Sequence, residues 1–138
     1  MTVSREFSDK LVTISNIYQF EIVSMEVMTG IVLLQHLLDP VVFEILRDEE
    51  QLGYEVYSRL LFSHSVPCIL ICVVSDINKN TPYFLDQRIE NVIQRFIQKL
   101  SSLTDTDFKK KVDGLIKKKT QVDASLDEQA DMYFKEII

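Results

Sequence analysis

The feature that most constrains the fold is an almost wholly apolar segment, residues 66–76, with the sequence VPCILICVVSD. A strand of this composition is typical of burial on both faces of a sheet. The segment before it, residues 53–63 (GYEVYSRLLFS), also has the residue types of a strand. Because only His64 and Ser65 separate the two segments, we expect an antiparallel hairpin.

Helical patterns occur on both sides of this hairpin. Apolar residues recur at helical spacing from Val27 to Leu38, which predicts one buried helix face. The pair Asp39-Pro40 is predicted to end that helix and start another, because Asp is a good N-cap and Pro is tolerated at the first helical position. Gly53 follows this second helix, and we expect it to form a left-handed C-terminal cap.

The remaining segments complete the predicted order of elements. Residues 11–23 are rich in β-branched and aromatic residues and predict one or two strands. Thr81-Pro82 opens a long helix, and Thr104–Asp107 and Ser125–Glu128 are capping boxes that each start a further helix. Strands and helices in this order predict an α+β fold, with helices packed on one face of a mainly antiparallel sheet. We expect a single domain over residues 1–138.

Charge and glycine content exclude several classes of function. The chain has 15 Lys and Arg against 21 Asp and Glu, a formal net charge of −6, which argues against non-specific nucleic-acid binding. Phosphate-binding loops require clustered glycines, and the three glycines of this chain are far apart in sequence. The longest uninterrupted apolar run, residues 66–74, is far shorter than the roughly 20 residues of a membrane helix. We therefore expect neither nucleic-acid nor membrane partners.

Histidine and cysteine give no candidate catalytic centre. A hydrolytic zinc site needs about three protein ligands, and neither His36 nor His64 lies in a His-x-x-Glu-His motif. Cys68 and Cys72 lie in the apolar strand, where burial suppresses thiol reactivity. We predict no catalytic residue, metal ligand or cofactor in this chain. Without a disulfide framework or a leader pattern, a cytoplasmic location is favoured.

The nonapeptide Leu46–Tyr54 (LRDEEQLGY) is a candidate functional segment, because a predicted helix is followed directly by a predicted strand within it. Arg47 offers a rigid fork of donors suited to carbonyl or carboxylate oxygens, and the Tyr54 hydroxyl can donate to a carbonyl oxygen. A plainer interpretation pairs Arg47 with Asp48 or Glu50 at the surface and leaves Tyr54 half-buried. The residues alone leave both interpretations open.

The nonapeptide resembles the Leu-Arg-x-x-Glu-Gln-Leu-Gly-Tyr segment of the insulinase family, the insulysin-like zinc metallopeptidases. The flanking segments are similar to those of the family and follow in the same order: PVVFEIL, PYFLDQRIENVIQRF, DTDFKKKVDGLIKKK and ADMYFKEII. The resemblance covers residues 17–138. Enzymes of this family contain four related α+β domains in two halves around a chamber, with the zinc site in the first domain.

The resemblance implies that residues 1–138 are a single, incomplete C-terminal domain without catalytic residues. It implies that Arg47 and Tyr54 bind the backbone of a peptide substrate, and that Gln51, Leu52 and Gly53 shape the turn. The implied partners are the peptide and an N-terminal catalytic half, which would hold the zinc. Strand edges left uncovered would favour self-association.

Two alternatives remain at this point. The chain may be read as a stand-alone, catalytically inactive protein of the same family that binds a peptide or a protein. A third interpretation is an unrelated α+β interaction domain with a chance match to the nonapeptide.

Overall fold

The computed structural model describes residues 10–123. The chain divides into two compact units, one ending at Ser101 and the other beginning at Ser102, and each is described by itself. The expectation of one domain over residues 1–138 stays a prediction. The helix expected from the Ser125–Glu128 capping box lies outside the described residues.

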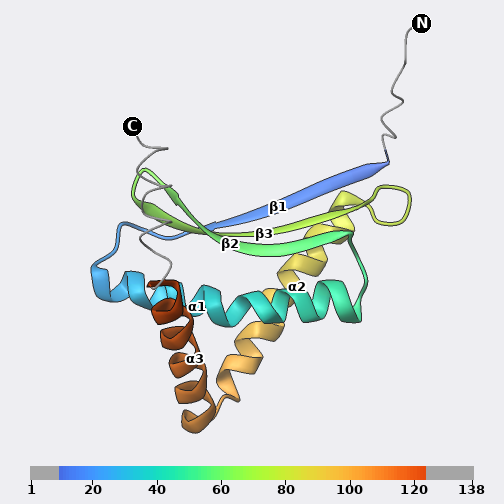
Figure 1. The fold of residues 1–138 in the computed structure, drawn as a ribbon. Helices are drawn as coiled ribbons and strands as arrows, with labels where there is room; N and C mark the ends of the chain where they lie inside the picture. Colours follow the sequence, from blue (N-terminus) through green and yellow to red (C-terminus); the bar gives the residue numbers. More distant parts are fainter. Residues whose placement is uncertain (1–9, 124–138) are drawn as a thin grey trace, which may run out of the picture. The chain divides into compact units, whose positions relative to one another are not determined.

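The first unit is built on a three-stranded antiparallel sheet in the order β1-β3-β2 (Figure 1). Its strands are β1 (Leu11–Gln19), β2 (Glu55–Ser63) and β3 (Val66–Asp76). The hairpin between β2 and β3 turns at His64 and Ser65, whose φ angles of 50° and 68° match the left-handed residues of a tight two-residue turn. The apolar strand β3 is the central strand, and it has buried residues on both faces, Ile69 and Ile71 on one and Cys68 and Cys72 on the other, as predicted. The segment 11–23 supplies one strand rather than two.

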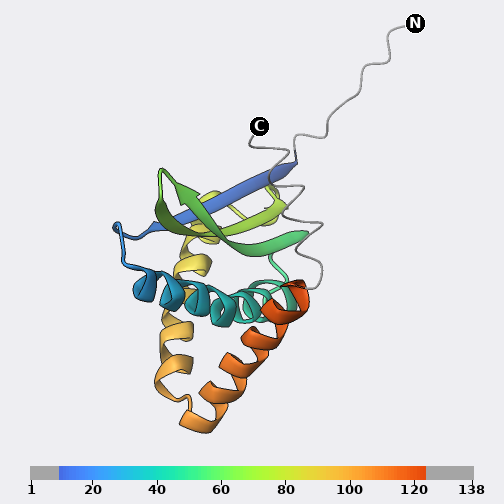
Figure 2. The same ribbon diagram turned by 60° about the vertical axis from the view of Figure 1, so that its left-hand side comes forward.

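Three helical elements of this unit cover one face of the sheet (Figures 1 and 2). They are α1 (Met25–Phe43), the π-helical turn η1 (Glu44–Glu49) and α2 (Pro82–Ser101). Their apolar sides meet β3 in one core, which confirms the α+β class. The fully buried members of this core are Val42, Ile45, Leu46, Ile71, Val73, Leu85, Ile89 and Val92.

The predicted break at Asp39-Pro40 is wrong, because α1 runs through Pro40 to Phe43. Asp39 does not cap a new helix, since its Oδ1 accepts a hydrogen bond of 2.8 Å from the Ser58 hydroxyl on β2. Pro40 removes one N–H from the helix, but the flanking residues Leu38 and Val42 are buried in the core. Tertiary packing therefore keeps the helix continuous.

Two predicted helix starts are confirmed. The Thr81 hydroxyl accepts a hydrogen bond of 3.2 Å from the Phe84 amide at the start of α2. In the second unit, α3 (Asp105–Asp123) begins at the predicted capping box, where the Thr104 hydroxyl accepts from the Asp107 amide at 3.2 Å. Each cap satisfies an amide that has no partner inside its helix.

The helical stretch Met25–Glu49 has the length and the apolar composition of a membrane-crossing helix. This is weak evidence on its own, because the core helix of a water-soluble protein meets the same criteria. Ile31, Leu38 and Val42 of this stretch are indeed buried in the core of the first unit. The expectation of no membrane partner stays a prediction.

Candidate functional site

The nonapeptide Leu46–Tyr54 forms the end of η1 and the turn into β2. The turn is wide: the Glu50 amide donates to the Ile45 carbonyl at 3.0 Å, and the Leu52 amide donates to the Leu46 carbonyl at 2.9 Å. Single π-helical turns of this kind are frequent at functional sites. This geometry brings the helix end directly beside the start of a strand.

The left-handed residue of this turn is Gln51, with φ 51°, so the predicted left-handed cap at Gly53 is wrong. Gly53 is needed for a different reason. A Cβ atom at this position would lie 2.6 Å from the Val74 carbonyl oxygen of β3, which is too close for any side chain. The next residue, Tyr54, donates its amide to the same oxygen at 2.7 Å. The close approach of two backbones, rather than a positive φ, therefore requires glycine.

A polar pair, buried Ser75 and half-buried Asn80, fixes the turn from the side of the sheet. The Ser75 hydroxyl donates to the Leu52 carbonyl, and the Asn80 side-chain amide donates to the same carbonyl at 3.1 Å and to the Ser75 hydroxyl at 2.9 Å. Ser75 is 1% exposed. The sequence analysis missed both residues, although a serine inside an apolar strand is a usable signal for a buried hydrogen bond.

Arg47 and Tyr54 come together across this turn. The Arg47 Nη1 atom donates to the Gly53 carbonyl at 2.8 Å and also to the Tyr54 carbonyl. The Tyr54 side chain is 58% exposed. Within residues 10–123, the Tyr54 hydroxyl and the Nε and Nη2 atoms of Arg47 make no hydrogen bond. The site thus presents an exposed tyrosine and, bound to its backbone carbonyl, a guanidinium with unused donors.

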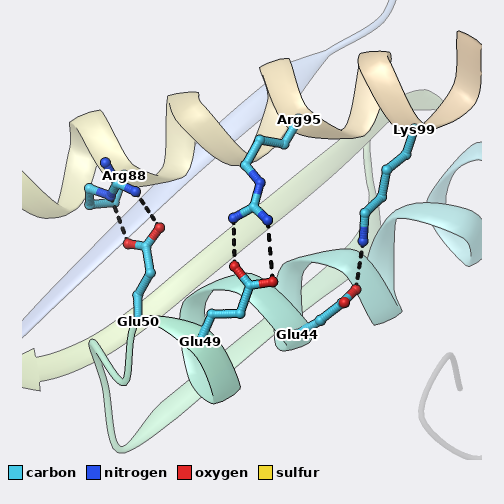
Figure 3. A network of polar contacts seen from close by, with 6 residues as sticks. All are labelled: Glu44, Glu49, Glu50, Arg88, Arg95 and Lys99. Atoms are coloured by element: carbon cyan, nitrogen blue, oxygen red, sulfur yellow. Dashed lines mark hydrogen bonds and ion pairs between the residues drawn. The ribbon is translucent and has the colours of Figure 1, made fainter.

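The plainer interpretation of Arg47, an ion pair with Asp48 or Glu50, does not occur in the described part of the chain. Glu50 instead accepts two hydrogen bonds from Arg88 of α2, one of them 2.7 Å from Nε to Oε2. Glu49 accepts two from Arg95, at 2.7 and 3.2 Å (Figure 3). Two of the three carboxylates that directly follow Arg47 in sequence are therefore bound by another helix.

A third pair joins the same two elements: the Lys99 ammonium donates to Glu44 at 2.7 Å (Figure 3). We call these three ion pairs the η1–α2 ladder. The hydrogen bond from Arg95 lowers the pKa of Glu49, and the hydrogen bond to Glu50 raises the pKa of Arg88. Both shifts favour the charged forms of these two side chains.

A metal site is not formed by the part of the chain that the structure describes, which holds no group of three His, Cys, Asp or Glu residues able to bind an ion. Cys68 and Cys72 are buried and free on β3, and His64 lies in the hairpin turn. The zinc that the resemblance implies therefore has no ligand set among these residues.

The comparisons with known proteins match most of this chain. The family model described as PQQ synthase PqqF-like, C-terminal lobe domain 4, matches residues 33–134, which include the nonapeptide. Human nardilysin is 29% identical over 106 residues, covering 77% of this chain and 9% of nardilysin. The A-factor-processing enzyme of Saccharomyces cerevisiae is 31% identical over 120 residues, covering 87% of this chain and 11% of that enzyme. The insulin-degrading enzyme of Drosophila melanogaster is 28% identical over 105 residues, covering 76% and 10%. The chain thus spans about a tenth of the length of these relatives.

Proposed function

This chain belongs to the PqqF-like C-terminal lobe family of insulinase-type peptidases, and from that premise we propose that it is the non-catalytic, substrate-binding part of an insulysin-like zinc metalloendopeptidase. In this role Arg47 and Tyr54 bind the backbone of a peptide substrate. In this proposal the zinc is held by a separate N-terminal catalytic half, as the resemblance to the insulinase family implies.

The observation that carries this proposal is that Arg47 is held in place while some of its donors stay unused. Its Nη1 atom is held by the Gly53 and Tyr54 carbonyls, while its other donors are unused in residues 10–123. An exposed guanidinium that is fixed at one edge and open at the other is arranged to bind an oxygen from another molecule. The hydroxyl of Tyr54, whose backbone carbonyl Arg47 binds, offers a second donor.

A guanidinium and a phenol hydroxyl are both donors that suit the carbonyl oxygens of an extended peptide. Arg47 and Tyr54 would hold the peptide in place, and Tyr54 would donate to the carbonyl oxygen as negative charge develops on it. Such contacts orient the substrate and stabilise charge on it, but they form no covalent bond with it and hold no metal. The hydrolytic chemistry is left to the catalytic half.

The test measures hydrolysis of a fluorogenic peptide by the 138-residue chain, alone and mixed with the zinc-binding N-terminal half of an insulinase-family enzyme. We expect activity in the mixture and none with the chain alone. Tyr54→Phe should lower turnover in the mixture by on the order of a hundredfold, the effect of removing one donor to a developing oxyanion. Its thermal unfolding should be unchanged, because the hydroxyl is exposed.

An unchanged turnover in Tyr54→Phe and in Arg47→Gln would overturn the assignment of these residues. A separate titration of the 15N-labelled chain with a capped, uncharged decapeptide tests binding directly. Binding without activity in the mixture would favour the alternative function, a stand-alone inactive protein that binds peptides or proteins.

A further inference from the structure

We infer that the outer edge of β1 is a docking site for an extended segment of a partner polypeptide that carries lysine or arginine on the side facing α2. The segment would add to the sheet as a fourth strand beside β1, which lies at one edge (Figure 1). The residues involved lie on β1 and α2, so the docking site is independent of Arg47, Tyr54 and the proposed function.

The backbone of β1 alternates between groups that bond to β3 and groups that point away from the sheet. At one end the Phe20 amide donates to the Pro67 carbonyl at 3.0 Å, and at the other the Ile77 amide donates to the Lys10 carbonyl at 2.7 Å. Both pairs extend the β1–β3 register by one residue, and in an antiparallel ladder hydrogen-bonded pairs alternate with pairs that are not bonded. The even-numbered residues of β1 therefore bond to β3. The residues that point outward are the odd-numbered ones: Leu11, Thr13, Ser15, Ile17 and Gln19.

The other edge of the sheet, on β2, is closed at its centre by side chains of α1. By the same alternation, the even-numbered residues of β2 point outward. Among them, the Ser58 amide donates to Asp39 Oδ1 at 3.4 Å, and the Ser58 carbonyl accepts from Gln35 Nε2 at 3.5 Å. A strand added here would have to displace both side chains. Within residues 10–123, no side chain binds the outward backbone groups of β1 in this way, so β1 is the open edge.

The composition of β1 does not protect this edge. Its nine residues (LVTISNIYQ) include no charged residue and no proline. Exposed edge strands normally carry such residues, because an unprotected edge pairs with other chains. The sequence of β1 is therefore typical of a strand that has a neighbour on both sides.

Two carboxylates of α2 determine the chemistry of that neighbour. Asp86 accepts a hydrogen bond from Asn16 Nδ2 at 2.8 Å, and Glu90 accepts one from the Tyr18 hydroxyl at 2.7 Å. Both acidic residues are exposed, and neither forms an ion pair in the described chain. An added strand would place side chains opposite Asn16 and Tyr18 on the same face, with Cβ atoms about 4.5–5.5 Å apart. Lysine or arginine there would be attracted to the two carboxylates, and an acidic residue would be repelled.

A second copy of β1 fits this edge less well than a basic strand does. It has no cation to offer, and it would bring its own Asp86 and Glu90 to the same edge. Like charges that face each other across a strand pair are destabilising. Charge complementarity therefore favours a basic segment of another polypeptide.

The experiment adds a capped peptide of nine residues to the full, 15N-labelled chain. Valine and threonine alternate in the peptide, and lysine replaces threonine at the fourth and sixth positions. We expect amide hydrogen exchange to slow at Thr13, Ser15 and Ile17, because these amides gain a partner, and to stay unchanged at the outward amide of Leu60 on β2. The same peptide with glutamate in place of lysine is the matched control, and it should bind at least about fivefold more weakly.

Variants of the chain test the edge and the charge separately. Ser15→Pro removes an outward amide without removing a bond to β3, and it should abolish both the slowed exchange and the binding of the lysine peptide. Phe62→Pro, which removes an outward amide of β2, is the matched control and should leave binding unchanged. Asp86→Asn with Glu90→Gln keeps both hydrogen-bond acceptors and should weaken binding of the lysine peptide roughly two- to fivefold.

Unchanged exchange at the three β1 amides up to millimolar peptide, or wild-type binding by Ser15→Pro, would overturn the docking site. If Ser15→Pro does not fold, Thr13→Pro makes the same test at another outward amide. Equal affinities for the lysine and glutamate peptides would overturn the basic character of the partner. Slow exchange at these amides without peptide would mean that the edge is already occupied, by a second copy if dilution abolishes it, and would also overturn the inference. None of these measurements involves hydrolysis, so a failure of the proposed function leaves them unaffected.

Discussion

Arg47 has an exposed, long side chain, but the turn around it removes much of its freedom. Bonds from one nitrogen to two consecutive carbonyls fix the guanidinium before any ligand arrives. A side chain ordered in advance loses less entropy on binding, so more of each new hydrogen bond appears as affinity. At the scale of single residues, the turn that carries these carbonyls is therefore as important as the arginine.

Gly53→Ala tests this dependence on the turn. The added Cβ would lie 2.6 Å from the Val74 carbonyl oxygen, so the strand start and β3 must move apart. We expect the free energy of unfolding to fall by about 1–3 kcal/mol, as for other overpacked sites. Urea denaturation followed by circular dichroism measures it.

Gly30→Ala is the control for that experiment. A Cβ at Gly30 would have no atom within 4 Å, and the residue lies inside α1. Alanine there should stabilise the chain by about 0.5–1 kcal/mol, because glycine loses more backbone entropy in a helix. Equal effects of the two substitutions would contradict the close approach of Gly53 to β3.

At the scale of elements, the η1–α2 ladder joins a π-helical turn to a helix that follows it by more than thirty residues in the chain. Its three cations, Arg88, Arg95 and Lys99, are spaced to lie on one face of α2 and meet Glu50, Glu49 and Glu44 (Figure 3). Beneath them, the apolar side of α2 packs in the core. The ladder therefore fixes where η1 ends, while apolar burial supplies most of the stabilisation.

The Glu49–Arg95 pair should make stability depend on pH. Arg95 lowers the pKa of Glu49 from its ordinary value near 4.5, so the folded chain binds this proton less readily than the unfolded chain. The stabilisation is present above the unfolded pKa and is lost as pH falls through the folded pKa. We expect the urea midpoint to decrease as the pH is lowered below about 4.5, and to decrease less in Glu49→Gln.

Asp48→Asn is the matched control for this pH dependence. Asp48 is the adjacent, exposed acidic residue and makes no ion pair within the described chain. Its substitution should leave the pH profile of the urea midpoint unchanged. A profile of Glu49→Gln that coincides with the wild-type profile would contradict the contribution of the pair.

The helices and strands also show which parts of the fold can be predicted from the sequence alone. The hairpin, the central strand and the starts of α2 and α3 follow from local signals: strand composition, a two-residue turn and caps. The continuation of α1 through Pro40 could not be predicted, because Asp39 is engaged by Ser58, 19 residues away. Likewise, Arg47 and Tyr54 are close because they are near in sequence, but the residues that hold their turn in place are distant in sequence.

Those supports are pairs distant in sequence. Asn80 contacts the Leu52 carbonyl from 28 residues away, and Arg88 contacts Glu50 from 38 residues away. Single residues of these types occur throughout the chain, and no spacing rule selects these partners. A π-helical turn is also invisible to a search for apolar residues at three- and four-residue spacing.

At the scale of the whole first unit, residues 10–101, the helices cover only one face of the sheet (Figure 2). The opposite face carries Ile17 of β1 in register with Leu70 of β3, and Ile17 is 61% exposed. Leu61 of β2 extends this apolar surface and is 40% exposed. In addition, β1 and β2 each pair only with β3 within these residues, which leaves one edge of each strand unpaired.

Exposed apolar faces and unpaired strand edges favour association between copies of a chain. We therefore expect sedimentation velocity to show a weight-average mass that rises with concentration. Ile17→Lys should weaken the association by at least about tenfold, because it removes an apolar side chain whose burial contributes roughly 1.5–3 kcal/mol. Gln98→Lys, at an exposed position of α2, adds the same charge elsewhere and should leave association unchanged.

A mass that corresponds to the monomer at every concentration would contradict self-association. Equal weakening by both lysine substitutions would instead attribute the association to net charge, since both raise the formal charge of −6 by one unit.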